Sequence, residues 1–132
     1  MNLENKVVVI SGGASGLGLA TARYLVKKKK AKVALLDMNR EAGLNAVEEL
    51  GDENAIFIAT DVTEENDVDA AISATIQKFG AIHVDINAAG IVAPKKILDK
   101  NGIAGSINNF RNVINVNLVG LYTVMAKCAE KM

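Results

Sequence analysis

Cysteine, proline, histidine and tryptophan are scarce in this sequence of 132 residues, which contains one, one, one and none of them. The single cysteine, Cys128, cannot form an internal disulfide, which excludes a disulfide-stapled scaffold and indicates a reducing, cytoplasmic setting. Fifteen basic and fifteen acidic residues leave a net charge of zero, so we expect neither nucleic acid nor a membrane surface as a partner. The apolar runs fall far short of the ~20 residues that cross a bilayer.

Half of the residues are hydrophobic, and they gather in four short runs rich in β-branched side chains. The runs lie at residues 7–10, 33–36, 55–59 and 84–86. Runs that are apolar without alternation are typical of parallel strands covered on both faces. Helical spacing links the apolar residues between the runs, and in the first such segment we expect Leu17, Tyr24 and Leu25 to face the core. The order βαβαβαβ predicts an α/β fold with a doubly wound parallel sheet.

The last third of the chain follows a different pattern. Residues 91–107 hold the only proline, Pro94, together with glycines and lysines, and we expect them to form a long surface loop. From about residue 109 to residue 132 the apolar spacing is helical again. The apolar residues there are too numerous for one narrow stripe, so we expect a long helix that is covered on two sides.

A glycine-rich stretch follows the first predicted strand directly and opens the first predicted helix. Residues 11–18 are Ser-Gly-Gly-Ala-Ser-Gly-Leu-Gly, with Gly12, Gly16 and Gly18 at the spacing G-x-x-x-G-x-G. Glycines at such a turn let the backbone approach a pyrophosphate, and the free amides at the helix start attract phosphate. The stretch predicts a dinucleotide site, and the alternative is a purely structural glycine turn.

Two acidic residues follow later strands at the same predicted sheet edge. Asp37 closes the second strand, where a carboxylate can accept hydrogen bonds from both hydroxyls of an adenosine ribose. Its charge disfavours a 2′-phosphate, so the predicted cofactor is NAD, with Arg40 as the only nearby cation. Asp61 and Val62 end the third strand and are expected beside the adenine ring. The alternatives are a helix cap for Asp37 and a helix-start turn for Asp61.

With these residues the chain resembles the short-chain dehydrogenase/reductase family from about residue 6 to residue 132. Ser11 stands where that family usually has threonine, and Asn87-Ala88-Ala89-Gly90 resembles its N-N-A-G motif. Asn117 matches an asparagine that kinks the long helix and supports a proton relay in the family. The resemblance implies the N-terminal part of a Rossmann-type fold. The pattern is most similar to that of type 2 3-hydroxyacyl-CoA dehydrogenases.

The resemblance assigns roles around NAD residue by residue. Ser15 and Leu17 would contact the pyrophosphate and the nicotinamide side, and Ala88 would contact the adenosine ribose through its backbone. Besides Asn117, the one catalytic residue implied, the remaining implied cofactor contacts are Gly12, Gly16, Gly18, Asp37, Asp61, Val62, Asn87 and Gly90.

The reaction implied by the resemblance is the oxidation of a secondary alcohol, such as a 3-hydroxyacyl-CoA, by hydride transfer to NAD. Members of this group are commonly homo-oligomers, so the resemblance implies a tetramer or a dimer. Lys95, Lys96 and Lys100 in the predicted loop would then meet the phosphates of an acyl-CoA substrate. The alternative is that the three lysines are simply solvated.

Other residues depart from the family pattern. Lys27-Lys28-Lys29-Lys30 runs into Ala31 where the family usually has a glycine, so we expect a strained or reshaped turn there. The lysines form either a functional basic patch or a solvated helix end. Cys128 is expected to be a buried thiol. No metal site is predicted, and His83 is expected to be a partly exposed residue at the start of a strand.

The serine and the Tyr-x-x-x-Lys pair that the resemblance implies for catalysis have no counterpart before Met132. Tyr24 and Tyr122 cannot replace that tyrosine and are expected in the core or in an interface. We therefore expect residues 1–132 to be one NAD-binding Rossmann-fold domain that lacks the catalytic segment. Two hypotheses remain. One is the cofactor-binding half of an NAD-dependent dehydrogenase, inactive alone, and the other is a non-catalytic nucleotide-binding half-domain that self-associates.

Overall fold

The computed structural model describes residues 2–132, in which strands and helices alternate in the predicted order. The strands are β1 (Val7–Ser11), β2 (Lys32–Asp37), β3 (Ala55–Ala59) and β4 (Val84–Asn87). The α-helices are α1 (Gly16–Lys29), α2 (Arg40–Leu50), α3 (Glu65–Phe79), α4 (Ile107–Ile114) and α5 (Leu121–Lys131). A π-helical segment, η1 (Asn115–Gly120), joins the last two helices.

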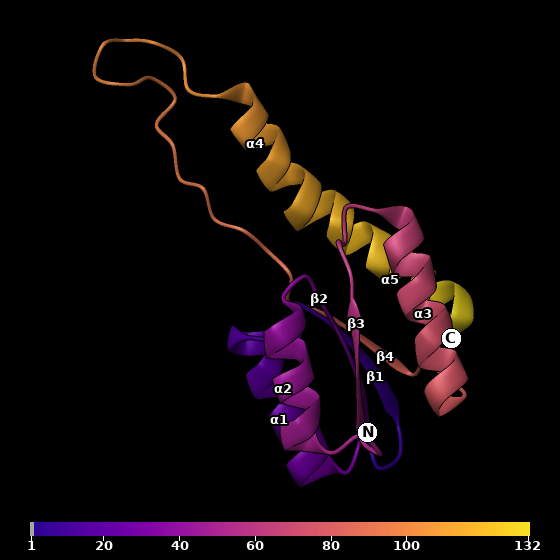
Figure 1. Cartoon of the computed structure of the whole chain (residues 1–132). Coiled ribbons are helices and arrows are strands. Elements are labelled where there is room, and N and C mark those ends of the chain that lie inside the picture. Colours follow the sequence, from indigo (N-terminus) through magenta and orange to yellow (C-terminus); the bar gives the residue numbers. More distant parts are fainter. Residues whose placement is uncertain (1) are drawn as a thin grey trace.

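The four strands form one parallel sheet in the order β3-β2-β1-β4, which confirms the predicted fold class. Val8 of β1 pairs with Val33 of β2 on one side and with Val84 of β4 on the other. Helices α1 and α2 lie on one face of the sheet, and α3 and α5 lie on the other face (Figure 1). Because all strands are parallel, their carboxyl ends meet at one edge, which is where open α/β sheets bind ligands.

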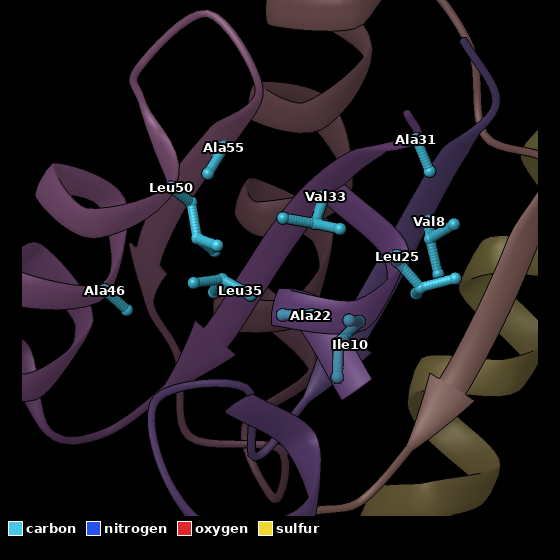
Figure 2. Packing of buried hydrophobic residues seen from close by; sticks show 10 residues of the cluster. All are labelled: Val8, Ile10, Ala22, Leu25, Ala31, Val33, Leu35, Ala46, Leu50 and Ala55. Carbon is cyan, nitrogen blue, oxygen red and sulfur yellow. The ribbon is translucent and has the colours of Figure 1, made fainter. Parts of the chain in front are cut away.

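Each face of the sheet has its own apolar core. The side chains of β1 enter the two cores alternately, and Val8, Val9 and Ile10 have no exposed surface. Figure 2 shows the core beneath α1 and α2, in which Ile10 and Leu35 of neighbouring strands lie with buried residues of both helices. This coverage on both faces explains why the strand sequences are apolar without alternation.

Helix α1 buries a different face from the one that its apolar spacing predicts. Gly18 and Leu25 are buried against the sheet. Leu17 is 84% exposed and Tyr24 is 54% exposed, so neither lies in the core of residues 2–132, and for Tyr24 the predicted alternative of an interface position is left untested. The cause is the glycine contact at the helix start, because Gly18 lies directly on the backbone of Gly12 and fixes the rotation of the helix.

Helix α1 ends in the strained turn that the missing glycine predicts. Lys30 has a left-handed backbone with φ of 53° and ψ of 34°. Its amide donates to the carbonyl oxygen of Val26 at 3.2 Å, and the amide of Ala31 donates to that of Leu25 at 3.1 Å. The hydrogen bonds of the turn are therefore complete, and the strain lies in the backbone of Lys30 itself, since a Cβ is unfavourable in this conformation.

Lys30→Gly is expected to raise the free energy of unfolding by about 1 kcal/mol, because glycine adopts a left-handed backbone without the Cβ penalty. Urea denaturation of the purified protein measures this change. The matched control is Lys28→Gly, an exposed position within the same helix, which is expected to lower the free energy of unfolding by up to about 1 kcal/mol. If both variants are destabilised alike, the turn at Lys30 is not strained.

The side of α5 that faces the sheet is well packed. Val124 and Cys128 are completely buried in the core formed with α3. The ammonium group of Lys127 lies 2.7 Å from a carboxylate oxygen of Glu65 and 3.0 Å from one of Asp69, both on α3. Apolar burial and these ion pairs together hold α5 against the body of the fold.

Residues 2–132 cover the long helix on one side only, and the second covered side that the sequence predicts has no cover among them. Leu118 is 60% exposed, and Tyr122, which was expected in the core or in an interface, is 64% exposed. Nothing else in residues 2–132 packs on this side. Figure 1 shows α4 projecting beyond the sheet, preceded by the predicted loop at residues 91–106. Within residues 2–132, no helix combines the length and the hydropathy that crossing a membrane requires.

Candidate functional site

A cavity of about 380 Å³ opens at the edge where the carboxyl ends of the strands meet. Its walls come from the loop after β1, the start of α1, the ends of β2 and β3, and the turn after β4. The predicted cofactor residues in its lining are Gly12, Ser15, Gly16, Leu17, Gly18, Asp37, Asp61, Val62, Ala88 and Gly90. Asn87 and Asn117 do not line the cavity. The fold thus brings together in one place residues that the sequence holds in four separate segments.

Three glycines shape this cavity, each for a different steric reason. Gly12 has a φ of +65°, and a Cβ there would lie 2.7 Å from the backbone carbonyl carbon of Ala88. A Cβ at Gly18 would lie 2.1 Å from the carbonyl oxygen of Gly12. Gly16 has a φ of +49°, and its Cβ direction is open. Glycine at positions 12 and 18 therefore lets the loop, α1 and the turn after β4 pack backbone against backbone, and glycine at position 16 leaves open space. The result is a cradle built of backbone, which suits the close approach of a pyrophosphate.

The start of α1 offers hydrogen-bond donors beside this cradle. Ser15 is the N-cap residue, with an extended backbone, and its hydroxyl makes no capping hydrogen bond. The first amides of a helix have no acceptor within the helix and carry the positive end of its dipole. An anion at this position can accept hydrogen bonds both from these amides and from the free hydroxyl.

Asp37 links the end of β2 to the glycine loop. Its Oδ2 accepts a hydrogen bond from the amide of Ala14 at 3.1 Å, and its Oδ1 accepts one from the amide of Asn39 at 3.0 Å. The N-cap of α2 is Asn39, whose Oδ1 accepts from the amide of Ala42 at 3.0 Å, so the alternative that Asp37 caps this helix is wrong. A carboxylate accepts about four hydrogen bonds, so Asp37 keeps acceptor capacity toward the cavity.

Asp61 forms the helix-start turn that was its alternative interpretation. Its Oδ1 accepts from the amide of Thr63 at 2.9 Å and from the hydroxyl of Thr63 at 2.7 Å. Val62, which follows Asp61, is only 7% exposed, and its side chain lies against the backbone of Gly120. Both residues still line the cavity, so the turn and a contact with an adenine ring are compatible.

The turn at residues 87–90 packs against the glycine loop from the other side. The amide of Ala88 donates to the carbonyl oxygen of Ser11 at 3.0 Å, and the hydroxyl of Ser11 donates to Oδ1 of Asn87 at 3.2 Å. Asn87 therefore lies behind the cavity wall and supports the turn. Ala88 and Gly90 themselves form part of the wall.

Asn117 lies within η1 and is fully engaged with the loop after β4. Its Oδ1 accepts from the amide of Ile91 at 2.8 Å, and its Nδ2 donates to the carbonyl oxygen of the same residue at 2.8 Å. The π-helical segment interrupts regular α-helical geometry around this residue, which agrees with the predicted kink. Asn117 thus ties the long helix to the chain that leaves the cavity.

The sequence was compared with models of known protein families, and the match covers all the elements that form the cavity. The model of the short chain dehydrogenase family matches residues 6–132. The chain belongs to the short-chain dehydrogenase family.

This chain is similar to animal proteins named 3-hydroxyacyl-CoA dehydrogenase type-2. It is 42% identical to the one from Rattus norvegicus and 39% identical to the one from Homo sapiens, each time over 99% of the chain and 50% of the relative. Zerumbone synthase from Zingiber zerumbet is 35% identical over 100% of the chain and 48% of its own length. The chain spans about half the length of the curated relatives it matches.

The cavity at the sheet edge also has lining residues that sequence reasoning missed. Met38 follows Asp37 directly, lines the cavity and is 72% exposed. An apolar residue directly after the carboxylate that ends a strand was therefore a signal by which the sequence could have indicated this lining residue. Ile91 and Val116 also line the cavity, and nothing in their type or spacing distinguishes them from core residues. A second cavity, of about 290 Å³, lies between the loop and α4 and is lined in part by Lys95 and Lys96.

Two side chains that the sequence predicts to be structural have no part in the cavity. Cys128 is buried, and burial together with the nearby charge of Asp85 raises the pKa of its thiol to about 12. His83 is exposed, and its Nδ1 accepts a hydrogen bond from the amide of Val7 at 3.1 Å. A thiol with this pKa is protonated at neutral pH and is not a nucleophile.

Asn117→Ala is expected to lower the free energy of unfolding by about 1–2 kcal/mol, because it removes two hydrogen bonds to Ile91. Amide hydrogen exchange at Ile91 is expected to become faster in parallel. Urea denaturation and exchange mass spectrometry measure the two effects. Asn112→Ala, at an exposed asparagine of α4, is the control and should change neither quantity measurably. Unaltered exchange at Ile91 in Asn117→Ala would contradict the assignment.

Proposed function

We propose that this chain is the cofactor-binding part of an oxidoreductase that oxidises a secondary alcohol by hydride transfer to NAD. The observation that supports this most directly is the cradle of Gly12 and Gly18 with the carboxylate of Asp37 at its edge. The bound NAD supplies the hydride acceptor, and the protein supplies binding and orientation. Asp37 disfavours the additional phosphate of NADP because two negative charges would meet there.

In this proposal, different residues of the cavity bind different parts of the cofactor. The first turn of α1, with Ser15 and Leu17, binds the pyrophosphate and reaches toward the nicotinamide side. Asp37 accepts hydrogen bonds from the ribose hydroxyls, and Asp61 and Val62 border the adenine. The role of Asn117 is to hold the loop after β4 in place, in support of a proton relay to which this chain contributes no other group.

The proposed substrate is a 3-hydroxyacyl-CoA. Support comes from the relatives named 3-hydroxyacyl-CoA dehydrogenase type-2 and from the cavity beside α4, where an apolar lining lies next to Lys95 and Lys96. Ammonium groups beside an apolar cavity suit a ligand with phosphate groups and an acyl chain. Lys100 does not line this cavity and is a solvated residue in this proposal. We also propose a cytoplasmic location.

A second candidate function is a non-catalytic nucleotide-binding domain that self-associates as a homo-oligomer, dimer or tetramer. The observation that favours it is the exposed apolar side of the long helix, which includes Phe110, Leu118 and Tyr122. Analytical ultracentrifugation distinguishes a monomer from an oligomer. Turnover of a 3-hydroxyacyl-CoA with NAD by the purified 132-residue protein would exclude the non-catalytic candidate.

Calorimetric titration of the purified protein with NAD, NADP and AMP tests the proposed cofactor. We expect NAD to bind more tightly than NADP by about tenfold or more, because Asp37 faces the position of the 2′-phosphate. AMP is expected to bind more weakly than NAD, since it lacks the pyrophosphate and the nicotinamide half. Equal affinity for NAD and NADP would contradict the role of Asp37, and no binding of any of the three would refute the proposed function.

A further inference from the structure

A carboxylate that the proposed site does not use lies behind the turn at residues 87–90. Asp85 stands on β4 opposite Val9 of β1, beside the buried thiol of Cys128. Its Oδ1 is buried and accepts no hydrogen bond from an N–H or O–H group within residues 2–132, and the thiol of Cys128 is only a weak donor to this carboxylate. Burial raises the pKa of Asp85 above its ordinary value of 3.8. A buried carboxylate with so little compensation costs stability, so its presence in this core needs a reason other than packing.

The other oxygen of Asp85 begins a chain of three hydrogen bonds that ends at the cavity. Oδ2 of Asp85 accepts from Nδ2 of Asn87. Oδ1 of Asn87 accepts from the hydroxyl of Ser11 at 3.2 Å. The hydroxyl oxygen of Ser11 in turn accepts from the amide of Ala89 at 3.4 Å. The core carboxylate is thereby connected to a turn whose residues line the cavity.

The carboxylate of Asp85 determines which group donates and which group accepts in each of these three hydrogen bonds. The side-chain amide of Asn87 has a donor end and an acceptor end, whereas an ionised carboxylate only accepts. Asp85 therefore keeps the donor end of Asn87 toward itself and the acceptor end toward Ser11. The hydroxyl of Ser11 then has to donate to Asn87, which leaves its lone pairs for the turn amide of Ala89. Without an acceptor at position 85 the side-chain amide of Asn87 is free to exchange its oxygen and nitrogen positions, and the order of donors and acceptors is lost.

We propose that Asp85 is a positioning residue of the nucleotide site, which holds the turn at residues 87–90 against the glycine loop through Asn87 and Ser11. The turn has little room to move against the glycine loop, because the backbone of Ala88 occupies the place where a Cβ of Gly12 would be. A shift of the turn changes the width of the cavity directly. The effect of Asp85 on binding rests on the proposed function, but its effect on the order of the turn does not.

Asp85→Leu tests the proposal because it separates binding from stability. The variant places an apolar side chain in an apolar core but also removes the acceptor of Asn87, and because these effects oppose each other the free energy of unfolding is expected to change little. Affinity for NAD is expected to fall about tenfold, and amide exchange at Ala89 is expected to become faster. Asp85→Asn keeps a carbonyl acceptor for Asn87 but also carries a donor, so its affinity for NAD is expected to lie between those of Asp85→Leu and the unaltered protein.

Calorimetric titration with NAD and hydrogen exchange mass spectrometry provide the two readouts. Unchanged exchange at Ala89 and unchanged affinity in a folded Asp85→Leu protein would overturn the proposal. If the unaltered protein does not bind NAD, the proposed function fails, and exchange at Ala89 still decides whether Asp85 positions the turn. If Asp85→Leu does not fold, the comparison of the unaltered protein with Asp85→Asn across pH takes its place.

The pH comparison depends on the groups around Asp85. The elements that pack on β4 are β1, which has no titratable side chain, and α5, which presents Cys128. His83 precedes the strand and is bonded to the amide of Val7. Affinity of the unaltered protein for NAD is expected to fall as pH is lowered from about 7 through the raised pKa of Asp85, because a protonated carboxyl is a weaker acceptor. Burial keeps the thiol of Cys128 protonated below pH 7 in both proteins, so parallel pH profiles of the unaltered protein and Asp85→Asn would overturn the proposal.

Discussion

Gly18→Ala is expected to lower the free energy of unfolding by about 3 kcal/mol and to abolish nucleotide binding. The added Cβ would lie 2.1 Å from the carbonyl oxygen of Gly12 and would also press on the backbone of Gly13. No flexible side chain lies at this contact to give way. Helix α1 would have to move away from the loop, which destroys the cradle and disturbs the packing of Leu25 at the same time. Urea denaturation and titration with NAD measure the two losses.

Gly16→Ala is the matched control for this prediction. Gly16 lies two residues earlier and has a φ of +49°, but its added Cβ would meet nothing within 4 Å. Its cost is limited to the left-handed backbone, about 1 kcal/mol. The comparison therefore separates the steric contact at Gly18 from the general loss of a glycine. Equal destabilisation by the two variants would show that the close approach of α1 to the loop is not what holds this end of the helix.

Asp37→Ala is expected to weaken the binding of NAD at least about tenfold and to reduce the preference for NAD over NADP by a larger factor. The first effect comes from the loss of the acceptor for the ribose hydroxyls, and from the loss of the hydrogen bond that holds the amide of Ala14. The second comes from the removal of the charge that repels a 2′-phosphate. Titrations of the variant with NAD and with NADP measure both quantities.

Asp52→Ala provides the control for net charge. Asp52 is an exposed carboxylate in the loop between α2 and β3 and does not line the cavity, so its removal changes the charge of the protein equally. Neither affinity is expected to change by more than about twofold, since exposed charges at a distance are screened by salt. If the preference for NAD is unchanged in Asp37→Ala, the proposed contact between Asp37 and the adenosine ribose is refuted.

The parallel sheet could be predicted from the sequence because burial on both faces makes the central strands apolar over most of their length. All five residues of β1 are buried, and no other element of this length tolerates so continuous an apolar run. The rotation of α1 could not be predicted in the same way. It is determined by the contact of Gly18 with the backbone of Gly12, in which no apolar side chain takes part. Apolar spacing also could not show that Leu118 lies uncovered, because it identifies residues that avoid water and not what covers them.

Most of the candidate site could be located from the sequence because its residues sit at junctions between elements. Topology alone brings such junctions together, since every parallel strand ends at the same edge. The cofactor roles of Gly12, Asp37 and the others remain predictions that the titrations test. Asp85 could not be singled out, because one aspartate in a short strand resembles any solvated residue of a sheet edge. Its significance depends on the depth of Oδ1 and on the bond to Asn87, which only the three-dimensional structure shows.

The pairing of β1 with two strands that lie far apart along the chain determines when this sheet can close during protein synthesis. Val8 meets its first partner at Val33 and its second only at Val84. At ~5–20 residues per second, a ribosome needs roughly 3 to 10 s for the intervening stretch of about 50 residues. Throughout this interval one edge of β1, the strand whose residues are all buried in the finished fold, has unmet hydrogen bonds and is open to strands of neighbouring nascent chains. Protection by chaperones is therefore needed most while residues 34–84 are being made.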